Sequence, residues 1–259
     1  MGANEADSPA EVYEQLFVPA LFRQWGELMV DVAGVEAGQH VLDVACGTGV
    51  LACAAAQRGA VVTGLDPNEE MLAVARRKHS AIEWLNGRAE ALPFDDQRFD
   101  VVLSQFGLMF FDDPVGALRE MHRVLRRDGR LAVAVCDALD HSPGYAVLAE
   151  LLQRLFGETV AEAFRRPFAC GAREPLRAQA VAAGLGDALV IRHDGVVRFA
   201  SVEALIATER ACAWTLGGLL DDGQFSRLHQ EAEESLQPFV LADGRVEFSM
   251  PALIVTATG

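Results

Sequence analysis

The sequence predicts an α/β protein with a doubly wound, mostly parallel sheet of seven strands and a helical cap. Short apolar runs alternate with helical patterns from residue 38 to residue 137, which is typical of right-handed crossovers between parallel strands. After Asp137 helical patterns dominate, and only two more strands are expected. Hydrophobic residues make up 51% of the 259-residue chain, so one large core can be buried. We expect a single domain over residues 1–259, with an N-terminal lid helix (1–37), a core (38–137) and cap helices with edge strands (138–259).

The elements of the lid and the core follow from apolar spacing and from helix start and stop signals. Ser8 and Pro9 begin a helix that runs to about Ala33, and Gly34 ends it. Asn68 is the expected N-cap of a later helix. Strands are predicted over residues 40–45, 61–65, 82–85, 99–104 and 129–135, with helices over 48–58, 68–79 and 114–127.

The cap region is predicted to be mainly helical. A strand-like stretch over residues 189–199 carries a turn signal at Asp194–Gly195, and a last strand is expected over 246–257. The expected helices cover residues 143–156, 160–164, 174–183, 202–212 and 224–236.

Composition argues against nucleic acid and membrane partners. The net charge of −15 repels polyanions, although acidity can also serve solubility alone. No apolar run reaches the roughly 18 residues of a membrane span, and residues 1–15 lack the pattern of a secretory signal. The five cysteines are odd in number and lack metal-ligand spacing, so we expect reduced thiols, no metal site and a cytoplasmic protein. A monomer and a homodimer are both compatible with the sequence.

The stretch VLDVACGTGV, from Val41 to Val50, predicts a strand, a small-residue turn and a helix start. Its glycines fit a dinucleotide fingerprint, and Asp66 follows at the end of the next strand, so a nicotinamide cofactor is compatible with the spacing. Asp43 argues against it, because a carboxylate on this strand would repel a diphosphate and no Arg or Lys in the turn offsets that charge. The site instead suits a ligand with a cation near Asp43, a ribose diol at Asp66 and a carboxylate at the helix N–H groups. Such a ligand is an amino acid joined to a nucleoside.

Four further segments extend this pattern and support S-adenosylmethionine as that ligand. VLDVACGTG is followed by VTGLDPNEEML, NGRAEALPFDDQRFD, FDVVLSQFGLMFFDDP and LREMHRVLRRDGRLAVAV. In this order the segments resemble the motifs of the class I, S-adenosylmethionine-dependent methyltransferases, of the small-molecule type related to quinone-biosynthesis enzymes. The resemblance covers about residues 41–136 and implies a Rossmann-like fold, with residues 38–137 binding the cofactor and an antiparallel last strand.

The resemblance implies a set of cofactor-binding residues. Asp66 is the expected ribose ligand, and Met71 is expected beside the adenine or simply in the core. Arg88 departs from the family, which commonly has Asp or Asn there, so we expect the Ala89 N–H to bind the ring, Arg88 to stack or turn outward, and Glu90 to supply the acceptor. The full set is Asp43, Ala45, Cys46, Gly47, Gly49, Asp66, Pro67, Met71, Arg88, Ala89, Glu90, Ser104 and Gln105.

The acceptor side of the site is less strongly indicated. His141 is the candidate general base, because it follows the fifth strand and has an ordinary pKa near neutrality, although a surface histidine would look the same. Aromatic side chains are expected to surround a flat, apolar acceptor, or else to bury the cap on the core. The chosen set is Tyr13, Phe22, Trp25, Phe106 and Trp214.

We therefore expect an enzyme that transfers a methyl group from S-adenosylmethionine to an apolar or aromatic small molecule. One alternative is an NAD-dependent oxidoreductase, although Lys78, the single lysine, lies on a predicted outer helix. A second alternative is a non-catalytic module that binds S-adenosylmethionine. The sequence does not choose between O-, N- and C-methylation.

Overall fold

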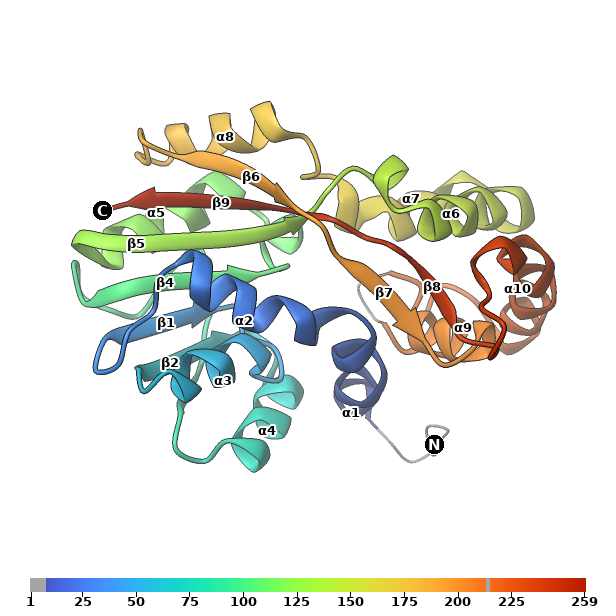
Figure 1. Cartoon of the computed structure of the whole chain (residues 1–259), viewed down its shortest axis with the longest axis horizontal. Helices are drawn as coiled ribbons and strands as arrows, with labels where there is room; N and C mark the ends of the chain where they lie inside the picture. The colour runs from blue at the N-terminus through green and yellow to red at the C-terminus, as the bar shows by residue number, and fades with distance from the viewer. Residues whose placement is uncertain (1–7, 213–214) are drawn as a thin grey trace.

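The computed structural model describes residues 8–212 and 215–259, in which a seven-stranded sheet forms the centre (Figure 1). The strand order is β3-β2-β1-β4-β5-β9-β6; the first five strands are parallel, and β9 is antiparallel to both of its neighbours. This confirms the predicted fold class. The strands are β1 (His40–Val44), β2 (Val61–Asp66), β3 (Glu83–Asn86), β4 (Phe99–Gln105), β5 (Leu125–Cys136), β6 (Leu189–His193) and β9 (Ala252–Thr258).

Helices cover both faces of the sheet. On one face α2 (Arg23–Val32) packs on α3 (Val50–Gln57), and α4 (Glu69–Lys78) lies beside β2 and β3; on the other face α5 (Pro114–Val124) packs on α8 (Arg173–Ala182) (Figure 1). The central strands β1 and β4 are paired on both edges and covered on both faces. They therefore carry the short apolar runs of buried parallel strands, at residues 41–42 and 101–103.

The predicted boundary between the third core helix and its strand is wrong by a few residues. The helix was expected to reach residue 127, but α5 ends at Val124 and β5 begins at Leu125. The pairing of β4 with β5 shifts register between Phe99 and Val101, and Asp128 has a φ of +66°. A bulged strand start of this kind leaves no clear periodic signal.

The two last predicted strands form one long antiparallel ribbon that leaves the sheet. Beyond β6 and β9 the ribbon continues as β7 (Val196–Phe199) and β8 (Val246–Ser249) and reaches the cap (Figure 1). His193 pairs with Ala252 and Val196 with Ser249, so the register continues across the break. The Asp194–Gly195 signal therefore marks a bend in a continuing strand rather than a chain reversal.

The N-terminal helix and the cap lie beside the carboxyl ends of the core strands. α1 (Pro9–Val12), a π-helical segment (Tyr13–Phe22) and α2 form one continuous helix, as predicted, and Pro19 lies within the π-helical part. The cap contains α6 (Pro143–Phe156), α7 (Glu158–Arg165), α9 (Val202–Ala211) and α10 (Asp222–Ser235). Short 3-10 turns cover Leu108–Phe110, Leu139–His141, Arg166–Phe168 and Gln237–Phe239.

The helices of this fold are short or amphipathic. Over the described ranges, 8–212 and 215–259, no helix combines the length and the apolar character that crossing a bilayer requires.

Candidate cofactor and acceptor site

The turn after β1 is held in a backbone conformation that its small residues permit. Ala45, Gly47 and Gly49 have φ values of +59°, +54° and +90°, and α3 begins directly afterwards at Val50. A Cβ on Gly49 would lie 2.4 Å from Cη2 of Trp84, so the turn also packs closely against β3. Because Gly49 gives α3 no side-chain cap, the start of this helix is able to face a ligand.

Asp66, at the end of β2, binds the backbone of this turn. Its Oδ2 accepts a hydrogen bond from Gly47 N at 2.9 Å, and its Oδ1 accepts one from Asn68 N at 2.8 Å. Burial raises the pKa of this carboxyl, and the two backbone N–H groups counteract that effect. Each oxygen retains acceptor capacity, and Asp66 lines the larger of two cavities at this sheet edge.

Asp43 lies behind the turn and not on a cavity wall. The side chain is 1% exposed; Oδ2 accepts a hydrogen bond from Ala52 N at 2.9 Å, whereas Oδ1 has no partner in the described part of the chain. Burial raises its pKa to about 8, and nearby Asp66 adds to this effect. Asp43 thus holds the first turn of α3, and its contact with a bound cation stays a prediction.

Two adjoining cavities open at the carboxyl ends of the core strands. The larger has a volume of about 390 Å³ and extends from Asp66 to the cap, and the smaller has about 110 Å³. Ala45, Pro67, Phe110 and Phe111 line both. The larger cavity is also lined by the predicted residues Gly47, Met71 and Gln105, and the smaller by Arg88, Ala89 and Glu90, whereas Cys46, Gly49 and Ser104 line neither.

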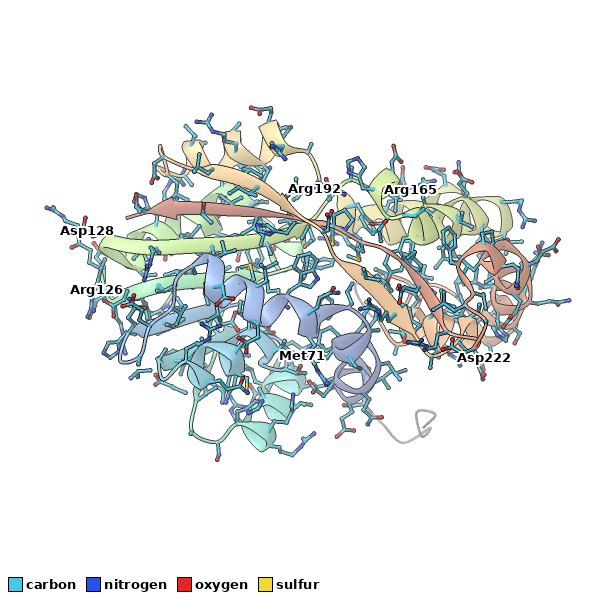
Figure 2. All side chains as sticks on the ribbon, in the orientation of Figure 1. Met71, Arg126, Asp128, Arg165, Arg192 and Asp222 are labelled. Atoms are coloured by element: carbon cyan, nitrogen blue, oxygen red, sulfur yellow. The ribbon has the colours of Figure 1, made fainter. Side chains whose placement is uncertain are left out.

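Met71 lies where the core helix α4 meets the N-terminal helix (Figure 2). It packs with Ala10 and Val74, and the ring of Tyr13 covers this small cluster. Met71 is therefore both a core residue and part of the wall of the larger cavity.

Arg88 turns outward from the smaller cavity, as one of the two predicted arrangements had it. Its side chain is 57% exposed, and one guanidinium nitrogen lies 2.5 Å from Oδ2 of Asp112 and 3.3 Å from Oε1 of Glu90. The same Glu90 oxygen accepts the N–H of Asp112 at 3.0 Å. These contacts fix the loop that borders the cavity.

The end of β4 connects the core to the N-terminal helix. Gln105 donates from Nε2 to the carbonyl of Phe22 at 3.3 Å, whereas its Oε1 is buried without a partner among residues that the structure describes. Phe106 has a φ of +57°, and a Cβ on Gly107 would lie 2.6 Å from that of Ala45. The turns after β1 and β4 are therefore in contact, and the role of Gly107 was not predicted.

The aromatic set divides into wall and core residues. Tyr13 and Phe22 line the larger cavity and stack with their ring centroids 5.3 Å apart, and Phe106 lies beside Phe22. Trp25 is 1% exposed, contacts Phe106 edge-on and lines neither cavity, so its predicted acceptor contact is wrong. It was misassigned because a helix that faces both a core and a cavity presents aromatic residues to each. Trp214 lies outside the described residues.

His141 is not placed to act as the predicted base. Its Nδ1 lies 2.8 Å from Oδ2 of Asp137, its side chain is 53% exposed, and it lines neither cavity. Arg192 binds the same Asp137 oxygen through Nε at 2.8 Å, at the point where the ribbon leaves the sheet (Figure 2). The cluster joins β5 to the cap and is structural.

A buried acid on the acceptor side was missed by the sequence analysis. Glu209, on α9, is 2% exposed and lines the larger cavity, and its Oε2 accepts a hydrogen bond from Oγ1 of Thr215 at 2.9 Å. Burial raises the pKa of this carboxyl from 4.5 to about 7. A signal was present: Glu209 follows Val202, Leu205 and Ile206 at the spacing of the buried helix face.

No group of three or more metal-ligating side chains occurs within residues 8–212 and 215–259. None of the five cysteines, all of which fall within these ranges, forms a disulfide.

Comparison with known proteins agrees with this geometry. The family described as "Methyltransferase domain" matches residues 42–133. A demethylmenaquinone methyltransferase of Renibacterium salmoninarum is 42% identical over 132 residues, which cover 51% of this chain and 56% of that protein. The chain thus spans about half the length of this curated relative.

Solved structures share the fold over most of the chain. A protein of Anabaena variabilis described as a "putative methyltransferase from antibiotic biosynthesis pathway" superposes with a TM-score of 0.69 at 15% identity, over 91% of this chain and 97% of that one. Phosphoethanolamine N-methyltransferase 2 of Haemonchus contortus, solved with S-adenosyl-L-methionine, has a TM-score of 0.62 at 19% identity, over 96% of this chain and 56% of that one. Residues 42–133 thus match the methyltransferase-domain family, and the chain is related to the class I, S-adenosylmethionine-dependent methyltransferases that include quinone-biosynthesis enzymes.

Proposed function

We propose that the chain transfers a methyl group from S-adenosylmethionine to an apolar, aromatic small molecule. The observation that carries this proposal is the pair of adjoining cavities. The acid Asp66 borders the larger one, whose cap side is mainly aromatic and aliphatic. One end suits a polar nucleoside with an amino-acid group, and the other suits a flat, apolar acceptor.

The residues present fit S-adenosylmethionine. Asp66 offers acceptor capacity to a ribose diol, and the buried Oε1 of Gln105 offers an acceptor without a partner in the described structure to an ammonium group. The backbone of the Gly47–Gly49 turn lies at the start of α3, where a carboxylate is favoured. The smaller cavity, with Ala89 and Glu90 in its wall, is the proposed adenine position.

The bound sulfonium would supply an activated methyl group, and the task of the chain is to orient the two reactants and exclude water. Tyr13 and Phe22 lie between the cofactor end and the cap, where they would hold the acceptor against the methyl group. Positioning of this kind in a dry pocket accounts for a large part of such rate enhancements.

The two alternatives have less support. A dinucleotide would place a diphosphate beside Asp66, with no compensating cation in the turn from Ala45 to Gly49. A non-catalytic binding module would need a filled acceptor pocket, whereas the larger cavity continues from Asp66 to the aromatic side chains of the cap.

The proposal is tested by methyl transfer. The purified chain is incubated with methyl-labelled S-adenosylmethionine and a panel of aromatic hydroxy compounds, amines and quinols, beside an Asp66→Ala variant. We expect labelled product from at least one aromatic acceptor and a strongly reduced yield from the variant. Cofactor binding without transfer to any member of the panel would instead favour the binding module.

A further inference from the structure

Glu209 is a buried acid in a cavity wall that is otherwise largely apolar. It lies on α9 in the cap, on the side of the larger cavity away from Asp66. The side chains around that part of the cavity are mainly aromatic, and Tyr145 packs edge-on against both Phe164 and Phe248, with ring centroids 5.8 and 5.0 Å away. A carboxyl group in this position is therefore a polar feature that an acceptor would meet among mainly apolar side chains.

The contacts of Glu209 with residues 8–212 and 215–259 leave part of the carboxyl unused. Oε2 accepts the Thr215 hydroxyl, and this is the one hydrogen bond that the carboxyl makes to the described residues. Burying a carboxylate with a single neutral donor is unfavourable, and a glutamine would accept the same hydroxyl without that cost. The hydrogen bond to Thr215 alone thus does not explain why an acid stands here.

The titratable and charged groups around the cavity do not neutralise Glu209. Tyr145 on α6 has its pKa raised by burial first and by Glu209 second, and burial dominates the raised pKa values of Tyr13 and Cys136. Cys212 follows α9 and adds to the raised pKa values of both tyrosines. Arg166 is the cation of the cavity wall, but its guanidinium lies over the ring of Phe110, 5.9 Å from the centroid, and makes no ion pair with Glu209.

We propose that Glu209 binds and ionises an aromatic hydroxyl group of the acceptor. The inference rests on the proposed function and adds to it a substrate class, aromatic hydroxy compounds, and a base. In the step, the O–H bond of the acceptor breaks, its proton passes to Glu209, and its electron pair stays on the acceptor oxygen, which makes the ring system a stronger nucleophile. A base whose pKa lies near the working pH is suited to this task.

The binding test uses 2-naphthol and 2-methoxynaphthalene, which has the same ring system without the O–H donor. Affinities are measured by calorimetry with S-adenosylhomocysteine present, for the wild type, Glu209→Gln, and Glu203→Gln as the matched control. Glu203 is an exposed acid on the same helix. We expect the wild type and the control to prefer 2-naphthol by about 10-fold or more above neutral pH, since a hydrogen bond to a charged group is strong, and Glu209→Gln to lose this preference.

The pH dependence of binding distinguishes a hydrogen bond to Glu209 from nonspecific apolar binding in the cavity. The preference for 2-naphthol should grow as the pH rises through the ionisation of Glu209, and Thr215→Val should move the midpoint to higher pH because Thr215 stabilises the charged form. A preference that persists in Glu209→Gln would overturn the proposal, as would a wild type that binds S-adenosylhomocysteine but not 2-naphthol. Failure of the wild type to bind S-adenosylhomocysteine would instead contradict the proposed function.

Discussion

Asp66 connects the glycine turn to the proposed cofactor. The turn is held by the hydrogen bond from Gly47 N, and the remaining acceptor capacity of the carboxyl faces the larger cavity. The sequence predicted this residue because a strand, a glycine turn and an acid at the end of the next strand together are typical of a ribose-binding site.

Replacing Asp66 with alanine is expected to weaken binding of S-adenosylhomocysteine by about 10-fold or more, because charge-assisted hydrogen bonds to the ligand are lost. Calorimetric titration measures the affinity, and a thermal melt shows whether the turn still folds. Asp95→Ala, at an exposed loop acid, should keep the affinity of the wild type. Equal affinity in Asp66→Ala and the wild type would remove Asp66 from the cofactor site.

Glu209 should lower the stability of the unliganded protein at neutral and higher pH. Its folded-state pKa of about 7 lies above its ordinary value of 4.5, so the folded protein holds the proton more tightly. The stability that the folded protein gains by holding this proton is fully present below about pH 4.5. It is lost as the pH rises through 7. A pKa shift of this size corresponds to about 3 kcal/mol in the free energy of unfolding.

Urea unfolding at about pH 5 and about pH 8 tests this linkage. The wild type should lose more stability between the two pH values than Glu209→Gln, while Glu203→Gln should follow the wild type. An identical pH dependence in all three proteins would mean that Glu209 is not a buried titrating group.

Residue positions were predictable from the sequence where a motif fixes the backbone. Gly47 and Asp66 belong to such a motif, and both line the cavity as expected. His141 and Trp25 were chosen by residue type and approximate position, which cannot tell a cavity wall from the protein core or the surface. Glu209 belongs to no motif, and only its place on the apolar face of a helix distinguishes it.

Among the elements, the turn between β1 and α3 depends on glycine. Gly49→Ala should destabilise the fold by about 2 kcal/mol or more, because a side chain there would have a φ of +90° and a Cβ 2.4 Å from Trp84. Denaturant unfolding measures the change. Gly186→Ala, at a position with open space and no positive φ, should change stability little; a similarly small effect at Gly49 would show that the turn is not constrained.

The N-terminal helix is attached to the ribbon through Gln24. Its Nε2 donates to the carbonyl of Val196 at 2.7 Å, and its Oε1 accepts from Val196 N at 3.1 Å, so the side chain pairs with β7 as a neighbouring strand would. Gln24→Ala is expected to increase amide hydrogen exchange in residues 9–22 and in β7, because this paired contact is lost.

Arg23→Ala is the matched control, since Arg23 is the exposed residue next to Gln24 on the same helix. It should leave exchange unchanged. Protection in Gln24→Ala equal to that of the wild type would mean that packing alone positions the N-terminal helix.

The strands and most helices were predictable because buried apolar runs and capping residues are local features. Asn68, for example, caps α4 as expected. The π-helical segment from Tyr13 to Phe22 was not predictable, because hydrophobic spacing shows that a helix exists and not which carbonyl each N–H reaches. The bend at Gly195 requires the position of Trp25, which is far away in sequence; a Cβ on Gly195 would lie 2.2 Å from its Cζ2.

At the scale of the whole molecule, the core provides the proposed cofactor site and the long ribbon carries the cap beside it (Figure 1). The core follows from its own sequence pattern. The cap does not, because its position depends on long-range pairing of β7 with β8 and on aromatic packing around Tyr145. These long-range contacts form the acceptor side of the site. For this reason the sequence identified few residues there.

The central claim is that the crevice at the ends of β1 and β2 binds a nucleoside joined to an amino acid and not a dinucleotide. Parallel calorimetric titrations of the wild-type protein with S-adenosylhomocysteine and with NADH test it directly. We predict binding of S-adenosylhomocysteine and no detectable binding of NADH. Binding of NADH without binding of S-adenosylhomocysteine would contradict the account.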